Sequence, residues 1–182
     1  EEGTSDAMWT GGWASGFGAR AAARGGAAGA DEAVLQEVLR SSPEDLHAVL
    51  ARSLPSGNSR AATKLLGGLA RARRPELAEA VLRGLRSLGT EVNVFHYNAA
   101  LNACAKAGDA DRALELLVAM AREEVEADVI THNAAINACD KAGAWTTALD
   151  LLRKMVAGGP QADTISYTST LGACESAGKW QH

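Results

Sequence analysis

The chain has 182 residues, enough for one domain or a short array, and charged residues interrupt every apolar stretch before the roughly 20 residues that would span a bilayer. Apolar residues make up 47% of the sequence and aromatic residues only 4%, which favours helices packed closely through small side chains. The formal net charge of −4 argues against a strongly basic protein that binds nucleic acid without regard to its sequence.

Residues 1–30 form a low-complexity lead-in rich in glycine and alanine. Acidic Glu1, Glu2 and Asp6 stand at its start, so the segment is at best the remnant of a transit peptide and is better explained as a flexible lead-in. The chain begins with Glu1 and stops within a sequence pattern at His182, and we therefore expect it to be a fragment of a longer protein.

Residues 31–58 are expected to form an N-terminal helical cap or a degenerate repeat. Between Asp31 and Leu54, apolar residues recur at helical spacing in two blocks separated by Ser41-Ser42-Pro43. Since proline fits the first turn of a helix, Pro43 is expected to open the second block.

The rest of the chain repeats with a period of 35 residues. Residues 94–128 and 129–163 align without a gap, and a truncated repeat covers residues 164–182. The segment HYNAALNACAKAG from His96 corresponds to THNAAINACDKAG from Thr131 and to SYTSTLGACESAG from Ser166. Three consecutive copies exclude coincidence and indicate a tandem array.

A degenerate copy of the same unit covers residues 59–93. Arg73 stands where the clear copies have glycine, so this turn needs either another geometry or a positive φ at a residue with a Cβ, at a cost of roughly 1 kcal/mol. Its apolar residues fall on the apolar positions of the clear copies: Leu65, Leu66, Leu69, Ala72, Ala78, Leu82 and Leu85.

Each unit predicts a pair of helices. In residues 94–128, the apolar spacing predicts a first helix from about Phe95 to Lys106, which Gly108 ends in the left-handed conformation. Asp109 is expected to cap a second helix. A lone hairpin cannot bury both of its faces, so neighbours must stack, and the predicted fold class is an all-α solenoid of helical hairpins. The expected buried face of the second helix is Ala113, Leu114, Leu116, Leu117 and Met120.

Cysteine and histidine residues do not form a metal-binding pattern. Cys104, Cys139 and Cys174 stand one repeat apart without any Cys-x-x-Cys pair, so they are expected to be small buried packing residues. His96 and His132 have no cysteine or carboxylate at ligand spacing, and both are expected on helix surfaces.

Four features together resemble the pentatricopeptide repeat: the 35-residue period, Tyr-Asn or His-Asn near the start of the first helix, the Lys-Ala-Gly turn, and Ala-Leu-x-Leu-Leu-x-x-Met in the second helix. Tetratricopeptide repeats are the nearest alternative, but they have a period of about 34 residues and a Trp-x-x-Leu-Gly-x-x-Tyr signature that is absent here. The resemblance extends from Ser59 to His182. It implies that the first helices line an inner surface on which each repeat binds one base of single-stranded RNA.

The resemblance assigns base reading to the fifth residue of each first helix and to the last residue of each repeat. An amide offers a donor and an acceptor, a hydroxyl offers both on one atom, and a carboxylate only accepts, so each pair presents a different pattern to a base. In the family, Asn with Asp suits uracil, Thr with Asn suits adenine, and Thr alone favours a purine, which predicts 5′-A-U-U-purine-3′. The reading residues are Thr63 with Asn93, Asn98 with Asp128, Asn133 with Asp163, and Thr168.

Two further sets of residues recur on the first helices. The second residue of each repeat is expected to stack on a base, and these residues are Arg60, Phe95, Ile130 and Ile165. Arg60 departs from the apolar pattern, although a guanidinium can also stack. Basic residues that share one later position are expected to contact phosphates, or else to form a solvated face: Arg71, Lys106 and Lys141. A structural alternative for Asn98 and Asn133 is that they cap a helix start.

Sequence-specific binding of single-stranded RNA is therefore the first functional hypothesis. The family implies organellar RNA processing, stability or translation, in a chloroplast or mitochondrion. The alternatives are a solenoid that binds protein partners in a larger assembly, and the RNA-targeting arm of an enzyme whose catalytic domain lies beyond His182. The sequence contains no nucleophile-base set, metal-ligand cluster or phosphate loop, so we expect neither catalysis nor a cofactor in it.

Overall fold

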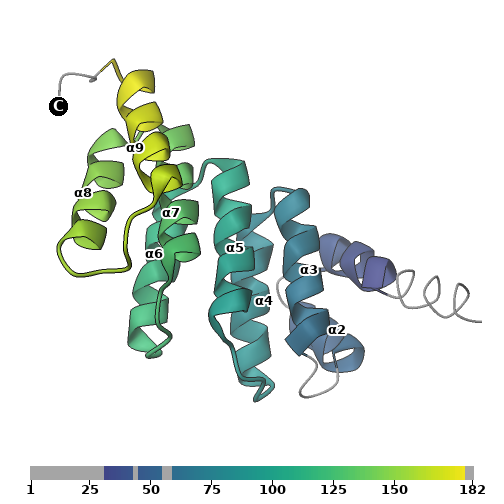
Figure 1. The fold of residues 1–182 in the computed structure, drawn as a ribbon. Helices are drawn as coiled ribbons and strands as arrows, with labels where there is room; N and C mark the ends of the chain where they lie inside the picture. Colours follow the sequence, from purple (N-terminus) through teal and green to yellow (C-terminus); the bar gives the residue numbers. More distant parts are fainter. Residues whose placement is uncertain (1–30, 43–44, 55–58, 179–182) are drawn as a thin grey trace, which may run out of the picture.

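The computed structural model describes residues 31–42, 45–54 and 59–178, and the regular secondary structure of these residues is entirely α-helical. This confirms the predicted all-α solenoid (Figure 1). A helix of residues 31–40 comes first. The helices that follow are α2 (Leu46–Ser53), α3 (Ser59–Arg71), α4 (Pro75–Ser87), α5 (Val94–Ala107), α6 (Ala110–Arg122), α7 (Val129–Ala142), α8 (Trp145–Val156) and α9 (Thr164–Ser176).

The helices form two layers (Figure 1). Helices α3, α5, α7 and α9 are the first helices of successive repeats, and each contacts the next directly. The second helices α4, α6 and α8 pack mainly against the first helices before and after them. Since helices on the inner side of a curved stack pack more closely, this arrangement puts the first helices on the inner side of the solenoid.

Small side chains allow this close approach of the first helices. Ala103 and Cys104 of α5 are fully buried, and Ala138 and Cys139 are buried at the same positions of α7. The predicted burial of the cysteines is confirmed, since Cys104, Cys139 and Cys174 are all buried free thiols. Burial raises the pKa of the Cys104 thiol to about 12, so this thiol stays protonated and unreactive.

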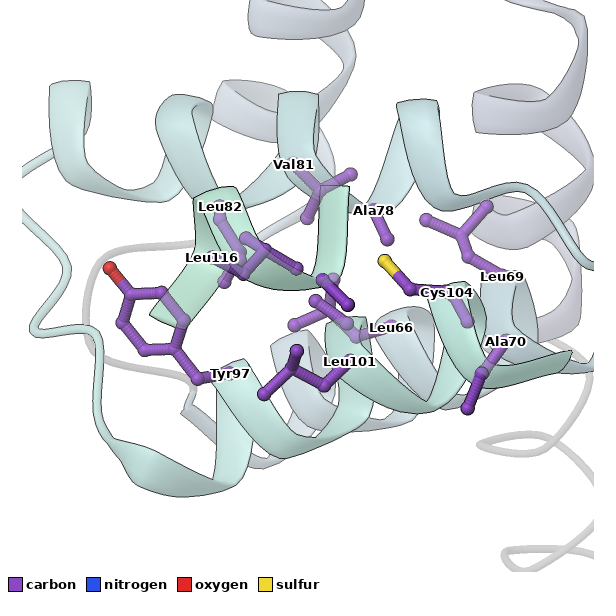
Figure 2. Close-up of a cluster of buried hydrophobic side chains, with 14 of the residues drawn as sticks. Leu66, Leu69, Ala70, Ala78, Val81, Leu82, Tyr97, Leu101, Cys104 and Leu116 are labelled. Atoms are coloured by element: carbon purple, nitrogen blue, oxygen red, sulfur yellow. The ribbon is translucent and has the colours of Figure 1, made fainter. Parts of the chain in front are cut away.

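Leucine side chains fill the space between repeats. Figure 2 shows Leu66 of α3, Leu82 of α4, Leu101 of α5 and Leu116 of α6 in one cluster of buried side chains. Each fully buried leucine contributes about 1.5 to 3 kcal/mol relative to an exposed one. The apolar face predicted for residues 59–93 is likewise buried, except for Ala72, which is exposed in the turn that follows α3.

The predicted helix ends are confirmed. Gly108 and Gly143 end their helices with φ of 76° and 69°. Arg73 takes the left-handed conformation that the missing glycine required, with φ of 54°. The Asp109 carboxylate accepts a hydrogen bond of 3.1 Å from the backbone N–H of Arg112 and so caps α6. The predicted interruption of the helix at Ser41-Ser42 is also confirmed. Pro43 and the lead-in of residues 1–30 lie outside the described residues.

The expectation that His96 lies on a helix surface is wrong. His96 is completely buried near the start of α5, and its Nδ1 accepts a hydrogen bond of 3.2 Å from the backbone N–H of Asn93. Its Nε2 lies 3.1 Å from the carbonyl oxygen of Ser59. The physical reason is that His96 occupies the third position of the helix, where a side-chain acceptor completes a capping box, as Thr131 and Ser166 do in the next two repeats.

Candidate nucleic-acid interface

Two neighbouring first helices, α5 and α7, carry all the predicted residue types on one face. On α5, Phe95, Asn98 and Lys106 lie three and eight residues apart, which brings them onto one stripe of a helix with 3.6 residues per turn. The same spacing recurs on α7 with Ile130, Asn133 and Lys141 at the equivalent positions. The structure therefore unites an apolar side chain, an amide and an ammonium group on each of two neighbouring inner helices.

The apolar members of the stripe are exposed in three successive repeats. Phe95, Ile130 and Ile165 are 68%, 65% and 60% exposed. A single exposed apolar side chain is ordinary, but a row of them at one repeat position forms a surface on which flat, apolar groups can rest. Arg60, at the equivalent position of α3, is also exposed.

In both predicted Asn–Asp reading pairs, the two side chains are in direct contact. The amide Nδ2 of Asn98 donates to both carboxylate oxygens of Asp128, at 3.2 and 3.3 Å. In the next repeat, Nδ2 of Asn133 donates to Asp163 over 3.0 Å. A carboxylate only accepts hydrogen bonds, so the nitrogen of each amide must face the acid.

The aspartates also cap the helices that follow them. Asp128 accepts from the backbone N–H of Thr131 over 2.8 Å, and Asp163 accepts from that of Ser166 over 2.9 Å. The asparagines do not cap, since Asn98 lies within α5 and its amide bonds to the side chain of Asp128 at the end of its own repeat. Helix capping is therefore a role of the two aspartates and not of the two asparagines, and each aspartate also bonds to the amide of its asparagine.

Hydrogen bonds keep both carboxylates ionised. Burial alone would raise the pKa of Asp128, but the N–H and hydroxyl of Thr131 and the amide of Asn98 outweigh it and hold the pKa below its usual value. For Asp163, bonds from the backbone N–H of Ser166 and the amide of Asn133 lower the pKa. Each pair therefore presents a negative charge at neutral pH.

Sequence reasoning missed two hydroxyl groups in this cluster. The Oγ1 of Thr131 donates to Oδ1 of Asn98 over 2.7 Å, and the Oγ of Ser166 donates to Oδ1 of Asn133 over 2.6 Å. Both hydroxyl residues are completely buried. The only indication in the sequence is a hydroxyl residue at the third position of each repeat that follows a predicted asparagine reader.

The remaining predicted readers are arranged differently. The Thr63 hydroxyl donates to the carbonyl oxygen of Ser59 in its own helix over 3.0 Å, while Asn93 caps α5 by accepting from the backbone N–H of His96. The structure thus does not join Thr63 and Asn93 through a hydrogen bond. The hydroxyl of Thr168 likewise donates to the carbonyl oxygen of Thr164, over 2.6 Å.

The predicted phosphate contacts lie near the carboxyl ends of the first helices. Arg71 and Lys141 are exposed and Lys106 is half-buried. The ammonium of Lys141 donates to the carbonyl oxygen of Ala105 over 2.8 Å, so it also stabilises the last turn of the preceding first helix. Beyond this stripe, the described residues contain no group of three or more His, Cys, Asp or Glu that could hold a metal ion, and no helix among them is long and apolar enough to cross a membrane.

Comparisons with known proteins identify the repeat. A family model described as "Pentatricopeptide repeat-containing protein" matches residues 61–182. The crystal structure of the pentatricopeptide repeat protein PPR10 from maize is similar over 84% of this chain, with 27% sequence identity and a TM-score of 0.64. PPR10 in complex with an 18-nucleotide psaJ RNA element matches 73% of this chain, with 27% identity and a TM-score of 0.60.

This chain spans 22% and 20% of the PPR10 chains in these two structures. A comparison with curated protein sequences finds no match. The family model covers most of the chain. It includes the helices from α3 to α9, apart from the first two residues of α3. The chain belongs to the pentatricopeptide repeat family.

Proposed function

We propose that this chain binds single-stranded RNA along its first helices, with one nucleotide on each repeat. The observation that carries the proposal is the recurrence of the stripe: an exposed apolar residue, a polar pair and a basic residue stand at the same positions of successive helices. Apolar side chains suit base faces, polar pairs suit base edges, and basic residues suit phosphates. The RNA-bound structure of the related PPR10 supports the same chemistry for this chain.

The geometry of the Asn98 pair favours uracil. One N–H of the amide is held by Asp128, which leaves the other N–H free to donate to a carbonyl oxygen of a base. The Oδ2 of Asp128 accepts from Asn98 over 3.3 Å and keeps a further lone pair that can accept from the base N3–H, directly or through water. Uracil presents an N3–H between two carbonyl oxygens, so it complements this order of donor and acceptor. Asn133 with Asp163 supports the same preference.

Taken along the array, the four readers give the proposed core 5′-A-U-U-purine-3′. The first and last positions rest on Thr63 and Thr168, whose hydroxyls are engaged with their own helices. We propose an organellar transcript as the RNA, and a chloroplast or mitochondrion as the compartment, on the strength of the family resemblance.

Exchanging one reading pair tests the proposal. Asn98→Thr with Asp128→Asn makes this pair identical to Thr63 with Asn93, so the preferred base at that nucleotide should change from uracil to adenine. Discrimination on the order of 1 to 3 kcal/mol is expected, by analogy with base-edge contacts in DNA readers. Fluorescence anisotropy at low salt, with RNAs that vary one nucleotide at a time, measures it. The Asn133 position is the internal control, and an unchanged base preference in a folded variant would refute the reading role.

A further inference from the structure

A buried hydroxyl holds the oxygen end of each reading amide. Thr131 and Ser166 are the third residues of their repeats, and each donates to the asparagine reader of the repeat before it, over 2.7 and 2.6 Å. Both hydroxyls are fully buried, so water does not compete for these bonds.

The proton of the Thr131 hydroxyl can be located by counting donors. Its Oγ1 already accepts from the backbone N–H of Asp128 over 3.1 Å, so its own proton points to an acceptor. The available acceptors are Oδ1 of Asn98 at 2.7 Å and Oδ1 of Asp128 at 2.8 Å. The Asp128 oxygen also receives the backbone N–H of Thr131, which makes Asn98 the less crowded acceptor.

The amide of Asn98 is consequently fixed at both ends. Asp128 holds its nitrogen and Thr131 holds its oxygen. A flipped amide would place its oxygen against a carboxylate, which repels it, so one N–H and one lone pair remain free in a defined order. Ser166 and Asp163 fix Asn133 in the same way.

We propose that Thr131 and Ser166 are positioning residues that set the base preference of the repeat before them. This inference rests on the proposed RNA-reading function. It makes each reader a set of three residues, of which the aspartate caps the following first helix and the hydroxyl lies on it. A uracil reader in this chain is therefore complete only when the next repeat supplies a hydroxyl.

The repeat of residues 59–93 provides a contrast within the chain. The residue equivalent to Thr131 is His96, whose ring reaches the backbone and hydroxyl of Ser59. Thr63 also bonds to the Ser59 carbonyl and is not held by His96. We expect weaker base discrimination at the nucleotide facing Thr63 than at those facing Asn98 and Asn133.

The test uses Thr131→Val, which keeps the shape and removes the hydroxyl, with Thr131→Ser as the matched control because serine serves at position 166. In the 182-residue chain, anisotropy is measured with RNAs that carry each of the four bases opposite Asn98. The valine variant should lose about fivefold of its preference for uracil there, the typical worth of one buried hydrogen bond. The serine variant should keep the preference, and the nucleotide facing Asn133 should show no change in either variant.

A purely structural role for Thr131 predicts a different result, because its hydroxyl also completes the capping box of α7. In that case Thr131→Val would lower the melting temperature and weaken binding to all four RNAs equally, which would overturn the proposal. In an Asn98→Ala background, Thr131→Val should cause no further loss of base preference, since the hydroxyl acts through that amide.

The proposed function and this inference can fail separately. A wild-type chain without any base preference would contradict the proposed function, whereas a wild-type preference that survives in Thr131→Val would contradict only the positioning role. The fixed orientation of the Asn98 amide can also be observed without RNA, by nuclear magnetic resonance of its side-chain amide protons. Their exchange with solvent should be slow in the wild type and in Thr131→Ser, and faster in Thr131→Val. Equal exchange rates in all three proteins would show that the Thr131 hydroxyl does not fix the amide.

Discussion

Single residues in this chain differ in how far their structural role follows from the sequence, and the left-handed turn residue Arg73 and the hydrogen-bonded Thr131 show the contrast. Arg73 and Glu124 adopt left-handed backbone with φ of 54° and 56°, whereas glycine occupies the position equivalent to Arg73 in the other repeats. The strain at Arg73 could be predicted, because the aligned repeats show where a glycine is missing. The pairing of Thr131 with Asn98 could not, because it depends on how α7 crosses α5 rather than on the spacing within one repeat.

Replacing Arg73 with glycine should stabilise the chain. The left-handed conformation costs a residue with a Cβ about 1 kcal/mol, and the added freedom of glycine in the unfolded state offsets part of the gain, so an increase of about 0.5 kcal/mol in the free energy of unfolding is expected. Urea denaturation followed by circular dichroism measures it. Arg73→Ala removes the same charge without relieving the strain, so a gain of equal size in that variant would show that charge is the cause.

At the scale of the helix, the start of each first helix is where the helix cap and the proposed base-reading residues coincide. Asn93, Asp128 and Asp163 each accept from the N–H of the third helical residue in a capping box. The two helices of each repeat could be predicted from apolar spacing and turn glycines. That Asp128 and Asp163 both cap a helix and bond to an asparagine could not be predicted, because the sequence shows only that they precede a helix. The burial of His96 could not be predicted either, because its two counterparts in the next repeats are hydroxyl residues.

Replacing Asp128 with asparagine should reduce the dependence of stability on pH. The folded-state pKa of Asp128 is lowered, so its stabilising contribution is complete above the unfolded pKa of about 3.9 and is lost as the pH falls through the folded value. Asparagine can still cap, as Asn93 does, but it does not titrate in this range. The difference in melting temperature between wild type and variant should therefore shrink as the pH falls from 6 to 2.

Thermal unfolding at a series of pH values checks this expectation. Asp111→Asn is the matched control, because it removes an acid from the first turn of the second helix α6. A wild-type advantage over Asp128→Asn that stays constant down to pH 2 would show that the carboxylate contributes through its shape alone.

At the scale of the whole molecule, neighbouring repeats carry opposite net charges. Residues 59–93 contain seven basic and three acidic residues, a net charge of +4, whereas residues 94–128 contain three and seven, a net charge of −4. Ion pairs of Arg112 with Glu79 and of Arg86 with Glu123 connect these two repeats through their second helices. Of these two pairs, Arg86 with Glu123 joins the excess charges of the two repeats, whereas Arg112 and Glu79 each carry the less frequent charge of their own repeat.

Removing the inner basic residues should weaken RNA binding without changing base preference. In a triple variant with Arg71, Lys106 and Lys141 changed to alanine, affinity should fall similarly for all RNA sequences, because phosphate contacts position a strand without reading it. For single strands, each lost contact should reduce the slope of log K against log salt concentration by about 0.7, so three contacts give a reduction of about 2. Anisotropy titrations at a series of salt concentrations around roughly 0.1 M, where the Debye length is about 10 Å, measure this slope.

The matched control changes Arg83, Arg122 and Lys154 of the second helices to alanine, all of which are exposed. It alters the net charge by the same amount, so long-range attraction falls equally in both triple variants, and only direct contacts distinguish them. The inner variant should therefore show the larger loss of affinity and the flatter salt dependence. Equal effects of the two triple variants would assign Arg71, Lys106 and Lys141 to a solvated face, and would leave base stacking on Phe95, Ile130 and Ile165 as the main source of affinity.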